Sequence, residues 1–403
     1  MAQTDGEKVA TLRDGQIPHP PAQNAGRMGH PRRDNVSLNK QISAHGDAMK
    51  RCALLLLLAS CAFAQEASVP KIEFQSVPGF FHLPEGMNFG EVAGVAVDSH
   101  KDVFVFSRGN TTGPAYGAAA AQLLEFSGRG YFLREIGHNL YGWSYAHSVK
   151  VDRNDDIWVA DKGSDVVVKF NHDGRVRMVF GRKQEASDEE TGPLKHPHPP
   201  LPPVDGMFRQ VTDIAWDSAG NSYVSDGYIN SRVAKYDKNG NWVKSWGEPG
   251  DQPGQFQQPH SIAVDAADHI YVADRGNRRI QVFDGDGNFL RQITIDVPFD
   301  PNAQPAIGNK PRLPITGNQT MAPGAPWAIC ITPGPRQVLY AADAYPGRIY
   351  KLTLDGKVLG VLGESGKQLK QFGWIHEIAC PSENELYVAE LLNWRVQKLI
   401  LNP

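Results

Sequence analysis

Residues 260–293 decide the fold, and they read HSIAVDAADHIYVADRGNRRIQVFDGDGNFLRQI. Four short apolar segments alternate with polar turns such as Asp286-Gly287-Asn288, which is the pattern of four antiparallel strands. The same module recurs from residue 94 onward, and its first strand opens at Gly94, His147, Thr212, His260, Trp327 and His376. Four-strand modules with a period of several tens of residues are typical of propeller blades. We therefore expect an all-β, six-bladed β-propeller.

The two ends of the repeat predict how the ring closes. The sixth module stops after three strands, at Leu401. We expect Lys71–Gln75 to supply the missing outer strand, because this would remove an open sheet edge.

Two Pro- and Gly-rich insertions, residues 182–209 and 296–325, interrupt the repeat. Long loops of this kind are either rims or lids over a site, or plain variation in length. In the first insertion, His196 and His198 are flanked by prolines, and we expect them to be solvated rather than to bind a ligand.

The N-terminal segment predicts export. Residues 49–64 combine a basic start, a short apolar core and an Ala-x-Ala end, which indicates a secretory signal peptide. The apolar core is too short for a membrane-spanning helix. Residues 1–48 are polar and aperiodic, so they are either a disordered arm or a misassigned upstream extension. The propeller would then occupy residues 65–403, in the periplasm or outside the cell.

Residues 58–61 also fit a lipoprotein processing site, in which Cys61 would carry the lipid; cleavage after Ala64 is the alternative. With that cleavage, the domain keeps Cys330 and Cys380. They occupy registers of opposite parity in equivalent strands, so we expect their side chains to face opposite sides and to remain two free thiols.

The charge balance excludes one class of partner. The chain has 41 Lys and Arg against 44 Asp and Glu, a net charge of −3. This leaves no basic field for a nucleic acid. We expect a monomer with no nucleic-acid partner and no membrane span.

Histidine opens the first strand of the second, fourth and sixth modules, as His147, His260 and His376. Alternate blades of a six-bladed ring stand about 120° apart, and the innermost strands line the axis, so these three imidazoles can converge. Three histidines with an open fourth position form a catalytic zinc arrangement. Copper, nickel and iron also accept imidazole. We expect the other histidines, including His138 and His172, to be ordinary.

A second group of residues follows the second strands, on one common face of the ring. Arg108, Tyr228 and Arg275 each differ from the residue that recurs at their position in the repeat. The planar fork of an arginine suits a carboxylate. A tyrosine beside a cation or a metal can have its pKa lowered enough to act as a base. An aspartate recurs at the end of the second strand, and we expect it to cap the turn that follows. These residues are Asp161, Asp226, Asp274 and Asp343.

At this point the chain resembles the peptidyl-α-hydroxyglycine α-amidating lyases, which are propellers built from NHL-type repeats. The resemblance covers about residues 90–400, and its most specific stretch is SDGYINSR at residues 225–232. It implies three zinc ligands, His147, His260 and His376. It implies a catalytic tyrosine and two active-site arginines, Tyr228, Arg108 and Arg275. It also implies a structural Ca²⁺ on the backbone carbonyls of Val95 and Val149 and on Glu377, where the family usually has aspartate.

The family reaction splits a C-terminal α-hydroxyglycine, peptidyl or N-acyl, into an amide and glyoxylate, and this makes the chain a carbon–nitrogen lyase by resemblance. On this hypothesis Zn²⁺ would acidify the substrate hydroxyl and Tyr228 would remove its proton. Arg108 and Arg275 would stabilise the phenolate or hold the substrate carboxylate. Three alternatives stay open: the same chemistry on a small N-acyl or carbamoyl α-hydroxyglycine, another metal-dependent propeller hydrolase such as a lactonase, and a non-enzymatic NHL binding propeller.

Overall fold

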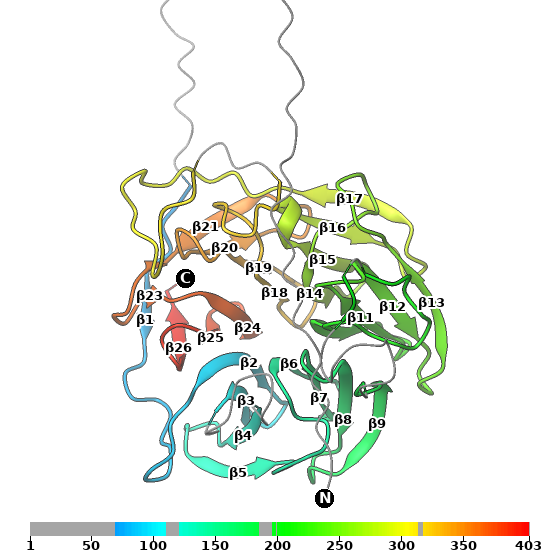
Figure 1. Ribbon diagram of the computed structural model, residues 1–403. Coiled ribbons are helices and arrows are strands. Elements are labelled where there is room, and N and C mark those ends of the chain that lie inside the picture. Colours follow the sequence, from blue (N-terminus) through cyan, green and yellow to red (C-terminus); the bar gives the residue numbers. More distant parts are fainter. Residues whose placement is uncertain (1–68, 110–120, 185–195, 199, 313–316, 403) are drawn as a thin grey trace, which may run out of the picture. The chain divides into compact units, whose positions relative to one another are not determined.

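The computed structural model describes residues 69–109, 121–184, 196–198, 200–312 and 317–402. In this part of the chain, six four-stranded sheets stand around a common centre, and β6, β14 and β24 are among the strands that face it (Figure 1). Neighbouring strands within each of these sheets are antiparallel, as the alternating sequence and tight turns predict. The expected all-β, six-bladed propeller is confirmed.

Each blade runs outward from an innermost first strand. Blade 1 consists of β2 (Glu91–Val97), β3 (Val103–Arg108), β4 (Gln122–Phe126) and β5 (Phe132–Ile136). Blade 2 consists of β6 (Ala146–Val151), β7 (Ile157–Asp161), β8 (Val166–Phe170) and β9 (Val176–Gly181). Blade 3 consists of β10 (Asp213–Trp216), β11 (Ser222–Asp226), β12 (Arg232–Tyr236) and β13 (Trp242–Trp246).

The second half of the ring repeats this plan. Blade 4 consists of β14 (Pro259–Val264), β15 (Ile270–Asp274), the 3-10 turn η1 (Arg275–Asn277), β16 (Arg279–Phe283) and β17 (Phe289–Ile293). Blade 5 consists of β18 (Ala328–Ile331), β19 (Leu339–Ala342), β20 (Ile349–Leu352) and β21 (Val358–Leu362). Blade 6 consists of β24 (Ile375–Ser382), β25 (Glu385–Glu390), β26 (Arg395–Leu401) and β1 (Phe74–Ser76). A small parallel pair joins blades 5 and 6, β22 (Glu364–Ser365) with β23 (Gln371–Phe372).

An N-terminal strand closes the ring, as predicted. β1 pairs antiparallel with β26, with Phe74 opposite Leu401 and Ser76 opposite Leu399. The strand begins later than the expected Lys71, because Lys71 instead makes a parallel bridge to Val361 in β21. The segment therefore also contacts blade 5.

The apolar core lies in layers between neighbouring blades. One such layer stacks Phe180 of blade 2 on Tyr236 of blade 3, with ring centroids 4.0 Å apart. Burying an aromatic side chain of this size contributes about 1.5–3 kcal/mol. Because every blade shares a layer with the next, the six sheets hold one another in place.

Cys330 and Cys380 form a disulfide, so the prediction of two free thiols is wrong. They lie in β18 and β24, and their Cα atoms are 6.2 Å apart. Within a single blade, residues of opposite parity do face opposite sides of the sheet. However, neighbouring blades pack through opposite faces, so residues of opposite parity meet in the layer that the two blades share.

The prediction for His196 is also wrong. Its side chain is 6% exposed, and Nε2 lies 3.1 Å from Oδ2 of Asp165. Burial of Asp165 raises the pKa of its carboxyl to about 6, and the imidazole is the partner that offsets this burial. His198 is exposed, as expected.

The predictions for residues 1–48, for the signal peptide at 49–64 and for Cys61 lie outside the described residues. Within the described ranges, no helical segment has the length and apolar character needed to cross a membrane.

Candidate active site and metal centre

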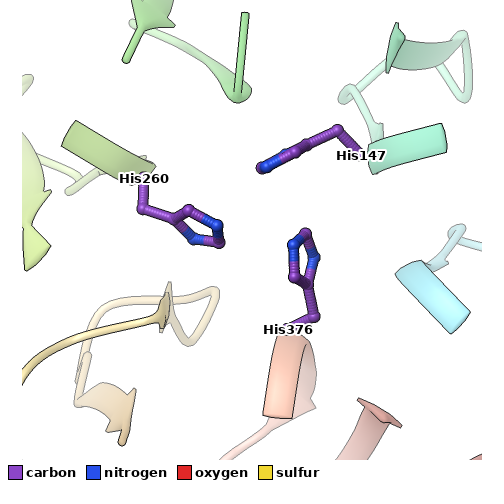
Figure 2. A group of neighbouring side chains, drawn as sticks. All are labelled: His147, His260 and His376. Carbon is purple, nitrogen blue, oxygen red and sulfur yellow. The ribbon is translucent and has the colours of Figure 1, made fainter. Parts of the chain in front are cut away.

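Three histidines meet at the centre of the ring. His147, His260 and His376 come from β6, β14 and β24, and Figure 2 shows their rings pointing toward one another. The ring centroids are 4.5 to 4.8 Å apart, and one ring nitrogen from each lies within 4.8 Å of the other two. The residues are 1%, 2% and 4% exposed. The repeat thus places three buried donors where one ion could bind.

The blade that follows each histidine fixes the orientation of its ring. Nδ1 of His147 lies 2.7 Å from the Thr212 carbonyl, and Nδ1 of His376 lies 2.7 Å from the Ala93 carbonyl. His260 makes the corresponding contact to Trp327, at 2.6 Å. Because a carbonyl only accepts, each Nδ1–H donates and each Nε2 keeps its lone pair. This is the tautomer found in metal-ligating histidines that have a second partner.

The electrostatics also suit a metal. Burial, reinforced by the neighbouring histidines and cations, holds the pKa of all three imidazoles well below the ordinary value, so they are neutral. Neutral imidazole is the form that binds metals. Among the described residues, Nε2 of His260 is buried without a hydrogen-bond partner, which suits an atom that binds a metal. The donor set fits a bound metal ion.

Tyr228 lies beside the three histidines. Its Oη is 3.4 Å from Nε2 of His147. The turn that presents it passes close to the next blade: a Cβ on Gly227 would lie 1.8 Å from the Pro259 carbonyl oxygen. Glycine before the tyrosine is therefore a steric requirement of the Asp-Gly-Tyr sequence.

Known proteins match the repeat and much of the chain. The profile of the NHL repeat family matches residues 256–283, from the approach to β14 to the end of β16. This chain is an NHL-repeat propeller homologous to the amidating lyases. Peptidyl-glycine alpha-amidating monooxygenase A of Xenopus laevis is 28% identical over 347 residues, which are 77% of this chain and 32% of that protein.

Two further relatives of the NHL propeller match shorter parts. A probable peptidyl-alpha-hydroxyglycine alpha-amidating lyase of Caenorhabditis elegans is 31% identical over 141 residues, which are 34% of this chain and 36% of that protein. NHL repeat-containing protein 3 of Mus musculus is 32% identical over 206 residues, 48% of this chain and 51% of that protein. The NHL propeller therefore spans between a third and about half of the length of these relatives.

The two predicted arginines approach Tyr228 differently. Arg108 is already engaged: Nη1 lies 2.5 Å from Glu91, Nε donates to the Ala146 carbonyl at 3.0 Å, and the guanidinium covers the ring of Tyr145. Arg275 donates to Gln258 at 3.2 Å, while its buried Nε has no hydrogen-bond partner in the described part of the chain. Its guanidinium carbon is 5.5 Å from the ring centre of Tyr228. Of the two, Arg275 has the donor available for a substrate.

Lys162 is a third cation beside Tyr228, and it is not among the site residues predicted above. Its Nζ lies 3.8 Å above the ring centre of Tyr228. The signal was present in the sequence, because Lys162 follows the second strand at the register of Arg108 and Arg275, and each of the three precedes a glycine. Burial raises the pKa of Tyr228, but Arg275, Lys162 and Arg108 together outweigh burial and lower it below the ordinary value.

Glu377, the acid expected to hold calcium, is already paired with an ammonium group. Glu377 Oε2 accepts the N–H groups of Val95 and Val149, each at 3.1 Å. Nζ of Lys150 lies 3.4 Å from Oε1 of Glu377 and 3.2 Å from Asp213. An ammonium group thus supplies the positive charge that a calcium ion would bring. We derive no role for calcium in this NHL propeller.

Proposed function

We propose that this NHL propeller is a metal-dependent lyase that splits a C-terminal α-hydroxyglycine, peptidyl or N-acyl, into an amide and glyoxylate. The observation that carries the proposal is the meeting of three neutral, buried histidines with a tyrosine held among cations. Homology to the amidating lyases supports the same reaction. His147, His260 and His376 would hold the metal, for which we propose zinc. When bound, zinc supplies Lewis-acid chemistry at the substrate oxygen.

The reaction is an elimination that consumes no water. The substrate hydroxyl loses its proton, its C–O bond becomes the carbonyl of glyoxylate, and the C–N bond breaks with protonation of the departing amide nitrogen. We assign removal of the hydroxyl proton to Tyr228, because its phenol borders the histidines and three cations stabilise its anion.

The two arginines take separate roles in this proposal. Arg275 has a buried donor, its Nε, that no described residue engages, and it can bind the substrate carboxylate. Arg108 is held by Glu91 and the Ala146 carbonyl, so it serves as a fixed positive charge near Tyr228.

Glyoxylate release from an N-acyl-α-hydroxyglycine, with and without a metal chelator, tests this function. We expect release that the chelator abolishes and that added Zn²⁺ restores. No release from protein that contains one zinc per axial site would refute the lyase assignment. A peptidyl and a short N-acyl substrate, compared by kcat/KM, would then separate the two substrate classes.

A binding propeller is the second candidate, because NHL repeat-containing protein 3 is a relative whose name specifies no reaction. The two candidates differ at Tyr228. Binding of a partner would survive Tyr228→Phe together with removal of the metal, whereas a lyase would lose turnover in both cases.

We also propose that the chain is exported, with residues 49–64 as the signal and residues 65–403 as the catalytic domain. N-terminal sequencing of the mature protein tests this. A start at Gln65 would support signal cleavage, a lipidated Cys61 would indicate an anchored form, and a retained N-terminus would refute export by this signal.

A further inference from the structure

The turns between the first and second strands repeat one hydrogen-bond pattern. In blade 1, Oδ1 of Asp98 accepts the N–H groups of His100 and Asp102, at 2.9 and 2.8 Å. The same turn recurs in blades 2, 3 and 4, around Asp152, Asp217 and Asp265. One carboxylate oxygen of each aspartate thus stabilises the turn.

The second carboxylate oxygen distinguishes blade 1 from these three blades. In blades 2, 3 and 4, an aromatic side chain of the second strand donates a hydrogen bond to this Oδ2 atom. These side chains are Trp158, Tyr223 and Tyr271. Blade 1 has Phe104 at this register, and phenylalanine has no donor. Consequently Oδ2 of Asp98 has no hydrogen-bond partner among the described residues, although Asp98 is only 6% exposed. A buried carboxylate oxygen without a partner needs a cation or a donor.

Two histidines face this oxygen. Nδ1 of His100 lies 3.7 Å from it, and the His172 ring centre is 6.0 Å from that of His100. One ligand atom from each of Asp98, His100 and His172 lies within 4.8 Å of the other two. His172 comes from the hairpin between β8 and β9, so the group joins blade 1 to blade 2. We refer to Asp98, His100 and His172 as the turn cluster.

A fourth polar group, the carboxylate of Asp155, borders the turn cluster and is held in place. Oδ2 of Asp155 lies 3.6 Å from Nδ1 of His100. Ser99 fixes this carboxylate, because its N–H and hydroxyl both donate to Asp155, at 2.9 and 2.6 Å.

We propose that the turn cluster is a second metal site, which binds a divalent transition-metal ion of the Zn²⁺ or Cu²⁺ type. Two imidazoles and a carboxylate suit such ions, whereas Mg²⁺ and Ca²⁺ prefer all-oxygen sets. Asp98 follows the end of β2 and lies five residues from Ala93, whose carbonyl contacts His376 at the axial site. The extended chain between Ala93 and Asp98 spans about 17 Å, and the two sites share no ligand residue. This site does not rest on the proposed lyase activity.

Zinc stoichiometry tests the proposal. The untagged full chain is stripped with a chelator, dialysed against micromolar Zn²⁺ and assayed for metal by mass spectrometry. The double variant His100→Ala and His172→Ala is expected to retain one zinc fewer than the wild type. Both side chains are exposed, so this variant should fold, which an unchanged unfolding temperature of the metal-free form would verify.

His269→Ala is the matched control. His269 pairs with Asp265, the blade 4 counterpart of Asp98, at 3.0 Å, but the described residues place no second histidine beside it. We expect this variant to keep the wild-type stoichiometry. An equal zinc content in the wild type and the His100/His172 variant would overturn the proposal, as would an equal loss in the His269 control.

Discussion

Replacing Lys150 by methionine keeps most of the length of the side chain and removes its charge. The carboxylates of Asp213 and Glu377 would then stay buried without their cation, since their side chains are only 2% and 3% exposed. Breaking a buried ion pair by removing one partner typically costs about 3–5 kcal/mol. We expect Lys150→Met to lower the free energy of unfolding by about this amount.

Urea unfolding followed by tryptophan fluorescence measures the effect, with Lys169→Met as the matched control. Both lysine side chains are 18% exposed, and each contacts two carboxylates. The two carboxylates that contact Lys169 belong to Asp152 and Asp156, whose side chains are 9% and 22% exposed. Solvent therefore screens the Lys169 ion pairs better than those of Lys150. The control should lose at most about 1 kcal/mol.

Two results would refute the reasoning about Lys150. Equal losses in the two variants would show that burial of Asp213 and Glu377 does not set the cost. A gain in wild-type stability on adding millimolar Ca²⁺, absent from Lys150→Met, would show that the lysine does not take the place of that ion. We expect instead that added Ca²⁺ leaves the stability of the wild type unchanged.

Three further predictions concern the active site and the disulfide. Tyr228→Phe should lower kcat by about 10²–10⁴ while zinc content stays at the wild-type level, and near-normal turnover would exclude the tyrosine as the base. Lys162→Met should raise the pKa of Tyr228, because a neighbouring positive charge is lost. The rising limb of the kcat/KM pH profile should then move to higher pH. An unchanged limb would argue against electrostatic coupling of Lys162 and Tyr228. Replacing Cys330 and Cys380 by serine opens a loop with a sequence separation of 50 and should cost about 4 kcal/mol in urea unfolding, whereas a loss below about 1 kcal/mol would contradict a stabilising crosslink.

The sequence predicted those features that the repeat itself determines. The six blades, the closing strand and the convergence of His147, His260 and His376 all follow from comparing one register around the ring. The same comparison could have found Lys162, which occupies the same position of the repeat as Arg108 and Arg275.

Features that depend on how blades pack against each other were not accessible in this way. The Cys330–Cys380 disulfide requires knowing that adjacent blades meet through opposite faces. Lys150 reaches acids on two other blades, Asp213 and Glu377, which no local pattern links. The side chain of His196 is buried against Asp165, a contact that strand periodicity does not encode.

The hydrogen bond from His376 to the Ala93 carbonyl spans 283 positions of the chain and joins the last blade to the first. The ligand tautomer at His376 is therefore set only after the ring has closed. A chain that is still being made, or that has lost its final strands, has the other two histidines but not the third in its binding form. The axial site should accordingly bind its metal only after the ring has closed. An incomplete chain should therefore lack any activity that depends on this metal.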